Sequence, residues 1–469
     1  MVPRMVDRPS AGSAARPLVM VSNRGPVSFR HDEAGEIVAR RGAGGLVSGI
    51  GPLMAGTGAV WVAAAMSDAD REVAATGVTD VEGFRFRALA VDPDAYRAFY
   101  DVMANAALWF VHHGLYDRAR RPVIDRQWWA AWAAYGTVNQ AFAEGVAEVA
   151  PEGAVVLVQD LHLCLLAEPL AVSRPDLDLV HFSHTPFAGP DDLRVLPDDA
   201  RTALLRGMAG HRACGFHTAR WRDAFVASCR ADGVEPPATF VSPLGPDVDD
   251  IGDVAAGPAG AAALADIEET VGDRRFIARV DRIELSKNLI RGFLAYEDLL
   301  DRRPEWREGV VFGAYVYPSR EGLPEYLAYR TEVEGIVARI NDRFATADWT
   351  PVLYDATDDF PRSVAALRRA DVVLVNPIRD GLNLVAKEAA VVNERDGVLV
   401  LSPEAGVWDE LADGVIPCHP FDITGTADAL HEALSLEGEA RRALSARWRE
   451  RSTARTPADW LADNLAAAD

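Results

Sequence analysis

Lysine is almost absent from this chain of 469 residues. Of its 48 basic residues only Lys287 and Lys387 are lysines, and the other 46 are arginines. Acidic residues number 70, so the formal net charge is −22. Nucleic acids and anionic membranes bind basic faces, and we therefore expect neither as a partner. Small anionic ligands stay compatible with this charge if a few cations gather in one cleft.

Cysteine and long apolar runs are scarce as well. The four cysteines form no CxxC pair and no Cys/His spacing typical of a zinc site, which favours a reducing, cytoplasmic compartment. The sequence contains no run of about 18 apolar residues and no apolar stretch behind its N-terminal arginines. We therefore expect neither a membrane span nor a signal peptide.

Short apolar runs alternate with helical stretches along the sequence. The runs at 18–21, 154–160 and 177–184 end in polar residues, as buried strands of a parallel α/β sheet do. A stretch rich in Gly, Pro and Ala at 242–273 precedes a second series of such runs. The sequence therefore predicts an α/β protein with a disordered tail (1–16), two doubly wound Rossmann-like domains that face a central cleft (17–245 and 246–445), and a C-terminal helix that packs back across both domains (446–469).

Two groups of residues in the N-terminal half could bind a sugar phosphate. Arg24 follows the first strand and can grip a phosphate with two nitrogens, while Gly44 and Gly45 let a ligand approach the backbone. An ordinary surface arginine beside a flexible loop is the alternative. Asp160 and His184 end later apolar runs, where they could hydrogen-bond sugar hydroxyls or exchange a proton with them. No HExxH motif or carboxylate triad indicates a metal site.

Two further groups lie in the C-terminal half. Arg282 and Lys287 occur where a strand leads into a helix, which suits a diphosphate at the helix N-terminus. A solvated charged loop is the alternative, and the lack of a GxxxxGK[ST] motif argues against ATP or GTP hydrolysis. Asp380 lies in a Pro/Gly turn before another helix and Glu388 about one turn into it, where they could bind sugar and ribose hydroxyls. A simple turn is the alternative. It would explain the Pro and Gly residues, but not the many polar side chains that lie between the apolar runs.

Both lysines belong to these groups. A compact ammonium is needed where the broad guanidinium fork of arginine does not fit, and this requirement would explain why a lysine is kept in so arginine-rich a chain. We predict that Lys287→Arg impairs turnover, whereas Lys387→Arg, on the helix after the turn, is tolerated.

Together these segments resemble the trehalose-6-phosphate synthase family of retaining glycosyltransferases. The resemblance rests on SNR at 22–24, YxxxxNxxLW at 100–109, DxH at 160–162, HTPF at 184–187, RIELSKN at 282–288, YPSR at 317–320 and RDGLNLVAKE at 379–388. It implies the GT-B fold, in which two Rossmann-like domains face a central cleft. It also implies that glucose moves with retention from a nucleoside diphosphate to glucose 6-phosphate, without a metal or another cofactor.

The resemblance also implies roles for individual residues. The catalytic residues would be Asp160 on the acceptor hydroxyls, His184 on the donor glucose, and Arg282 and Lys287 on the diphosphate. Four residues would hold the acceptor, with both arginines on its phosphate: Arg24, Tyr100, Trp109 and Arg320. The donor would be bound by residues of the glycine loop, by an aromatic residue beside the nucleobase, and by residues of the Pro/Gly turn and the helix after it. These are Gly44, Gly45, Phe360, Asp380, Asn383, Leu384, Val385 and Glu388.

The sequence departs from the family pattern at two positions and leaves several choices open. Ala64 replaces the second tryptophan of a W-x-G-W segment, which loosens the acceptor pocket, and Glu284 stands where many members have Asp. UDP and GDP rank level as the leaving group, and homo-oligomerisation stays open. A cyclitol-coupling pseudo-glycosyltransferase and a catalytically silent sugar-phosphate-binding protein are the alternatives. We expect same-face displacement, because no convincing pair of carboxylates supports a covalent intermediate.

Overall fold

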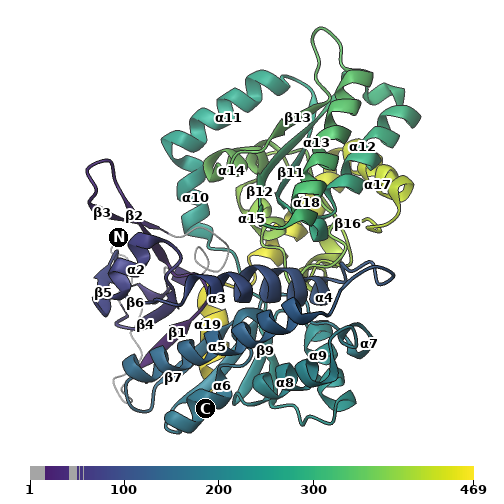
Figure 1. Ribbon diagram of the computed structural model, residues 1–469. Coiled ribbons are helices and arrows are strands. Elements are labelled where there is room, and N and C mark those ends of the chain that lie inside the picture. The colour runs from purple at the N-terminus through teal and green to yellow at the C-terminus, as the bar shows by residue number, and fades with distance from the viewer. Residues whose placement is uncertain (1–15, 42–49, 52, 56) are drawn as a thin grey trace.

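The computed structural model describes residues 16–41, 50–51, 53–55 and 57–469, which form two α/β units built on separate sheets (Figure 1). Nearly all of the predicted tail, together with Gly44 and Gly45, lies outside these residues. No helix within the described ranges combines the length and the apolar character that crossing a membrane requires.

The first sheet has eight strands in the order β10-β9-β8-β7-β1-β4-β6-β5, and only β5 and β6 pair antiparallel. β7 is buried along its whole length, as the continuous apolar runs of a sheet covered on both faces require. The strands are β1 (Leu18–Val21), β4 (Val60–Ala64), β5 (Val78–Val81), β6 (Phe84–Leu89), β7 (Val155–Gln159), β8 (Asp178–Ser183), β9 (Ala213–Phe216) and β10 (Ala238–Val241); β2 (Val27–His31) and β3 (Ile37–Arg41) form a separate hairpin.

One continuous helical segment beside this sheet carries two of the predicted acceptor residues. It consists of α3 (Pro93–Arg97), the π-helical η1 (Ala98–Leu108) and α4 (Trp109–His113), and Tyr100 and Trp109 lie on it. Wide π turns are frequent at functional sites. The other helical elements of this half are α2 (Asp68–Ala74), α5 (Arg126–Val149), η2 (Leu161–Leu163), α6 (Ala167–Ser173), α7 (Pro190–Leu193), α8 (Asp198–Ala209) and α9 (Ala219–Ala231).

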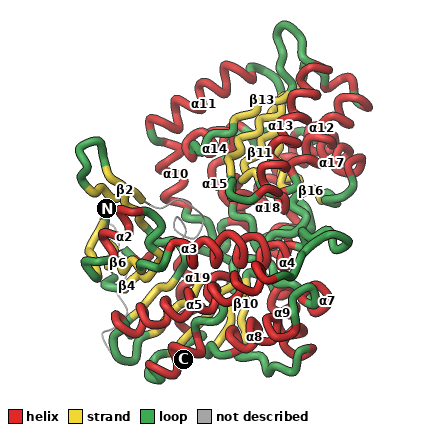
Figure 2. The backbone as a smooth tube through the Cα atoms, viewed as in Figure 1, coloured by secondary structure: helices red, strands yellow, loops and turns green. Residues whose placement is uncertain are grey.

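The second sheet is entirely parallel, in the order β13-β12-β11-β14-β15-β16, with helices on both sides of its strands (Figure 2). Its strands are β11 (Arg275–Ile283), β12 (Val310–Pro318), β13 (Val352–Asp355), β14 (Val372–Val375), β15 (Val398–Leu401) and β16 (Ile416–Pro417). Its helical elements are α10 (Val248–Ala256), α11 (Pro258–Val271), η3 (Leu285–Lys287), α12 (Leu289–Arg302), η4 (Pro304–Trp306), α13 (Pro324–Phe344), α14 (Phe360–Arg369), α15 (Val385–Val392), α16 (Trp408–Leu411), η5 (Ala412–Gly414), α17 (Ile423–Ser435) and α18 (Gly438–Ser452). Both sheets confirm the predicted α/β class.

The last helix returns to the first sheet. α19 (Pro457–Ala466) lies among the N-terminal elements in Figure 1, and the Trp460 ring packs 5.0 Å from that of Phe182 in β8. The chain therefore crosses between the two sheets twice. The crossings touch at Gly245, where a Cβ atom would lie 1.9 Å from the Arg455 carbonyl oxygen. The predicted boundary at 446 falls inside α18, and the contacts with the first half begin at Arg455, whose guanidinium reaches Ser242 and Pro243, and continue along α19.

Candidate active site

The two halves meet where the turn before α15 touches the segment after β8. A Cβ atom on Gly381 would lie 1.9 Å from the backbone oxygen of His184, so only glycine permits this approach. The Trp221 indole donates to the Gly381 carbonyl at 3.0 Å, and the Arg379 guanidinium pairs with Asp192 at 3.0 Å. The contacts bring two predicted motifs, HTPF and RDGLNLVAKE, to one point between the sheets.

Lys287 and Asp380 form an ion pair at this point. The Lys287 ammonium donates to Asp380 Oδ2 at 2.6 Å and lies 3.9 Å from Asp281 Oδ1. Asn383 Nδ2 donates to the same Asp380 oxygen at 3.0 Å. Burial alone would raise the pKa of the Asp380 carboxyl, but the Lys287 charge holds it below its ordinary value. The sequence placed these residues in separate motifs, and the structure brings them together.

Arg282 and Arg320 meet because their strands are in register. Ile283 at the end of β11 pairs with Pro318 at the end of β12, so Arg282, the last residue but one of β11, and Arg320, just beyond β12, lie at the same edge of the sheet. Arg320 lies over the face of Trp109 with its Cζ 3.8 Å from the ring centroid, and the Arg282 Cζ lies 5.5 Å from the same centroid. Two cations from the second half therefore lie over one aromatic ring of the first half, where cation–π attraction favours them.

Three of the four predicted acceptor residues, Arg24, Tyr100 and Arg320, lie near His162. The Arg24 guanidinium donates to the Tyr100 hydroxyl at 2.9 Å, and the Tyr100 ring stacks on the His162 ring at 5.8 Å. Burial lowers the pKa of His162 to about 4, and the charges of Arg24 and Arg320 act in the same direction. The two arginines predicted to share the acceptor phosphate therefore both lie near one neutral imidazole.

Asp160 and His184 are held by contacts that the sequence did not reveal. Asp160 adopts φ 67° and ψ 176°, a strained conformation for a residue with a side chain, and its Oδ1 accepts from the His184 N–H at 3.2 Å. Gln159 Oε1 accepts from His184 Nε2 at 2.9 Å, which leaves Nδ1 to accept from His217 Nε2 at 3.1 Å. Burial lowers the pKa of His184 to about 4, so the ring is neutral near pH 7.

The predicted nucleobase and ribose residues line one small pocket. Phe360 is 44% exposed at the start of α14 and shares the pocket with Leu384 and Glu388, as well as with Asp250 from α10. Burial, together with the Asp250 charge, raises the pKa of Glu388 to about 7. Just before the helix that starts at Val385, Asn383 Oδ1 accepts from the Ala386 N–H at 3.2 Å. Asp250 was missed because it lies in the Gly-, Pro- and Ala-rich stretch at 242–273, outside every motif.

Lys387 is buried and has a structural role. Its side chain is 0% exposed, and its ammonium donates to the Leu244 carbonyl at 3.0 Å and to Glu410 Oε2 at 2.9 Å. Leu244 belongs to the first crossing between the sheets, so Lys387 ties α15 to that crossing. Lys387 lies on the helix after the turn, as predicted, but its side chain is enclosed, so we now expect the larger head in Lys387→Arg to overpack the site.

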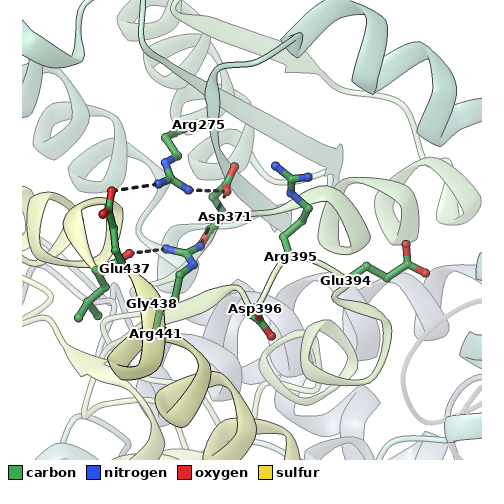
Figure 3. Close-up of a pocket in the computed structure, with 9 residues that line it drawn as sticks. Arg275, Asp371, Glu394, Arg395, Asp396, Glu437, Gly438 and Arg441 are labelled. Atoms are coloured by element: carbon green, nitrogen blue, oxygen red, sulfur yellow. Dashed lines mark hydrogen bonds and ion pairs between the residues drawn. The ribbon is translucent and has the colours of Figure 1, made fainter.

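A larger cavity of about 470 Å³ lies elsewhere (Figure 3). Arg275 and Asp371, which line it, stand at the amino ends of β11 and β14, opposite the strand ends that carry the predicted site. Arg275 pairs with Asp371 at 3.2 Å, and the Arg441 guanidinium also contacts Asp371. Acidic side chains balance the arginines of the lining, so the cavity offers no excess positive charge for an anion. Within the described ranges, no group of three or more His, Cys, Asp or Glu side chains could hold a metal ion.

Comparisons with known proteins agree on one family. The model for glycosyltransferase family 20 matches residues 16–468. The bifunctional trehalose-6-phosphate synthase/phosphatase of Thermoproteus tenax is 31% identical over 483 residues, covering 96% of this chain but only 64% of that protein. A UDP-forming alpha,alpha-trehalose-phosphate synthase from Burkholderia xenovorans, solved with glucose-6-phosphate, is 28% identical, with a TM-score of 0.84 over 96% of this chain and 99% of its own. An E. coli structure bound with UDP-2-fluoro glucose is 26% identical, with a TM-score of 0.84 over 96% and 98% of the two chains.

Proposed function

This chain belongs to glycosyltransferase family 20, and from that premise we propose that it makes α,α-trehalose 6-phosphate by transferring glucose, with retention, from UDP-glucose or GDP-glucose to glucose 6-phosphate. The ligands of the two solved relatives, glucose-6-phosphate in one and UDP-2-fluoro glucose in the other, support these substrate classes. We also propose that the enzyme is cytoplasmic and works without a metal or another cofactor.

The observation that carries the proposal is the meeting of Lys287, Asp380 and His184 between the two sheets. Lys287 and Asp380, which pair at 2.6 Å, both belong to the second half of the chain. Because Gly381, next to Asp380, touches the backbone of His184 at the end of β8, the ion pair lies near His184. A sugar bound there would touch groups from both halves, while a diphosphate would extend toward the N-terminus of α15. A reaction between two substrates needs such an arrangement, with one substrate bound on each half.

Departure of the nucleoside diphosphate is the step for which these cations are suited. The bond from the glucose C1 to the phosphate oxygen breaks, its electron pair leaves with the oxygen, and negative charge grows on the phosphate. We assign Lys287 and Arg282 to this charge. Asp380 and Asp281 raise the pKa of the Lys287 ammonium, so it stays protonated throughout. Fixed charges that face a developing anion need no reorganisation as the reaction proceeds.

The carboxylates of the site support displacement without a glycosyl-enzyme. Asp380 Oδ2 already accepts hydrogen bonds from Lys287 and Asn383, which makes it a poor nucleophile. Asp160 accepts from the His184 backbone and is placed to orient an acceptor hydroxyl. We propose that this hydroxyl attacks the face from which the diphosphate leaves and gives its proton to the departing phosphate oxygen. A covalent glycosyl-enzyme found by mass spectrometry would contradict this mechanism.

Coupling to a cyclitol is the second candidate, and one observation favours it. Ala64, which stands where relatives carry a tryptophan, is buried at the end of β4, and its N–H donates to the Asn23 carbonyl at 3.1 Å. The guanidinium of Arg24, the residue after Asn23, donates to the Tyr100 hydroxyl. The loss of an indole at this wall of the acceptor site affects the choice of acceptor more than the choice of donor.

Initial rates distinguish these functions. Each of UDP-, GDP- and ADP-glucose is supplied with glucose 6-phosphate, with and without a chelator, and trehalose 6-phosphate is measured. We expect product with UDP- or GDP-glucose at the same rate under both conditions. A rate that falls with the chelator would contradict metal independence. Product formed only with a cyclitol phosphate would favour the second candidate, and ligand binding without any product would favour a silent binding protein.

A further inference from the structure

Glu284 connects the two arginines of the site. One of its oxygens, Oε2, lies 3.2 Å from the Arg282 guanidinium and 3.0 Å from that of Arg320. The other, Oε1, accepts from the Ser286 hydroxyl at 3.0 Å. The side chain is 0% exposed. In the sequence, Glu284 was notable only as the replacement for an aspartate; in the structure it lies between the proposed donor cation and the proposed acceptor cation.

The two arginines depend on Glu284 to different degrees. Arg320 is only 10% exposed and has other partners: its Nε donates to Asn105 Oδ1 at 2.9 Å, its NH1 donates to the Tyr326 hydroxyl at 3.1 Å, and its guanidinium stacks on Trp109. These contacts would hold it without the carboxylate.

Arg282 has far fewer restraints. Its side chain is 34% exposed, and its polar contact to the described part of the chain is the single ion pair with Glu284. Its other close contact within the described ranges is the looser one to the Trp109 ring, at 5.5 Å. A long side chain with this freedom samples several rotamers in the absence of a fixed partner. Glu284 is therefore the group that decides where the Arg282 charge points.

The buried Glu284 carboxylate is ionised, so it forms ion pairs with both arginines. Burial would raise the pKa of Glu284, but the charges of Arg282 and Arg320 lower it to about 2. A buried charge without a partner raises the free energy of the folded state, so the ion pairs between Glu284 and the two arginines are strongly favoured. Removing the charge should release the less restrained of the two, which is Arg282.

We infer that Glu284 is a positioning residue for glucose transfer: it holds the Arg282 guanidinium against the leaving diphosphate and acts on catalysis through that arginine. This inference rests on the proposed function, because it assigns Arg282 to the leaving group. It predicts a specific pattern of coupling. The loss caused by changing Glu284 disappears when Arg282 is already absent, and it persists when Arg320 is absent.

A double-mutant cycle on the full chain tests this coupling. The variants are Glu284→Gln, Arg282→Ala, Arg320→Ala and the two doubles that contain Glu284→Gln, and kcat, donor KM and Tm are measured for each. Removing an aligned charge costs about 10²–10³ in kcat, so Glu284→Gln should lower kcat about 10²-fold, with a smaller change in donor KM. In the Arg282→Ala background the same change should have little further effect. In the Arg320→Ala background its full effect should remain.

Two controls separate positioning from folding. Glu284→Asp keeps the charge on a shorter stem and should restore much of the lost kcat. Glu321→Gln changes an exposed carboxylate that pairs with Arg330 at 2.7 Å, and should leave kcat unchanged. Equal losses from Glu284→Gln with and without Arg282, or a loss explained by unfolding alone, would overturn the inference while the proposed function stands. No product from the unaltered chain would overturn the proposed function, and this inference with it.

Discussion

Replacing Lys287 with arginine should slow glucose transfer while leaving the fold intact. The ammonium lies 2.6 Å from Asp380 and 3.9 Å from Asp281, and the side chain is only 13% exposed. Arginine keeps the positive charge, so both carboxylates stay neutralised and stability changes little. Its wider, planar head moves the charge away from the diphosphate. Misplacing such a group costs about 2.7–4 kcal/mol of transition-state stabilisation, or about 10²–10³ in kcat.

The other lysine provides the matched control, because the same substitution there should have the opposite signature. Lys387 is fully enclosed between α15, the Leu244 carbonyl and Glu410. A larger head overpacks this site at a cost of about 1–3 kcal/mol. For domains of this size each kcal/mol lowers Tm by roughly 2–4 °C. The kcat of the molecules that remain folded should change little.

Steady-state rates at saturating glucose 6-phosphate, together with thermal unfolding of the same samples, separate the two effects. Lys287→Arg should lose kcat with an unchanged Tm, and Lys387→Arg should lose Tm with an unchanged kcat. Turnover by Lys287→Arg at the rate of the unaltered chain would refute the role assigned to the Lys287 ammonium. That role is also refuted if both variants lose the same fractions of kcat and Tm.

Two other substitutions test separate parts of the site. Gly381→Ala places a methyl group against the His184 carbonyl, so it should push the two halves apart and lower both kcat and Tm. Unchanged kcat and Tm would show that this contact is dispensable. Glu388, with a pKa of about 7, gains its charge as pH rises through neutrality, and Asp250→Asn should lower that pKa. The pH at which donor KM changes should then shift downward, whereas the exposed neighbour change Asp249→Asn should leave the KM profile in place. Because the folded pKa of Glu388 lies above its ordinary value of 4.5, stability falls as pH rises from there to 7, and Asp250→Asn should raise Tm at pH 8.

Local patterns were enough to predict the α/β class and, in the first sheet, the strands β1, β7 and β8. β7 and β8 are continuous apolar runs that end at Asp160 and His184, and such runs are diagnostic because both faces of the sheet are covered. The return of α19 to the first sheet was only partly predictable. The helical pattern after residue 437 is visible in the sequence, but the break between α18 and α19 that lets Trp460 reach Phe182 depends on packing.

Residues that support the site from outside the motifs could not be found in the same way. His217 reaches His184 because β9 lies beside β8, and Asp250 reaches Glu388 because α10 packs on α15. Both contacts depend on the order and packing of elements that are distant in sequence. Glu284 was visible within a motif, but its link to Arg320 follows from the register of β11 with β12, which no single segment contains.

Release of the nucleoside diphosphate and formation of the disaccharide, followed together in one sample, test the central claim most directly. The chain is supplied with UDP- or GDP-glucose and glucose 6-phosphate, the diphosphate is quantified, and the anomeric configuration of the product is read by NMR. We predict one α,α-linked trehalose 6-phosphate for each diphosphate released, and no release without glucose 6-phosphate. Release of diphosphate that does not depend on glucose 6-phosphate, or a product with inverted configuration, would contradict the account.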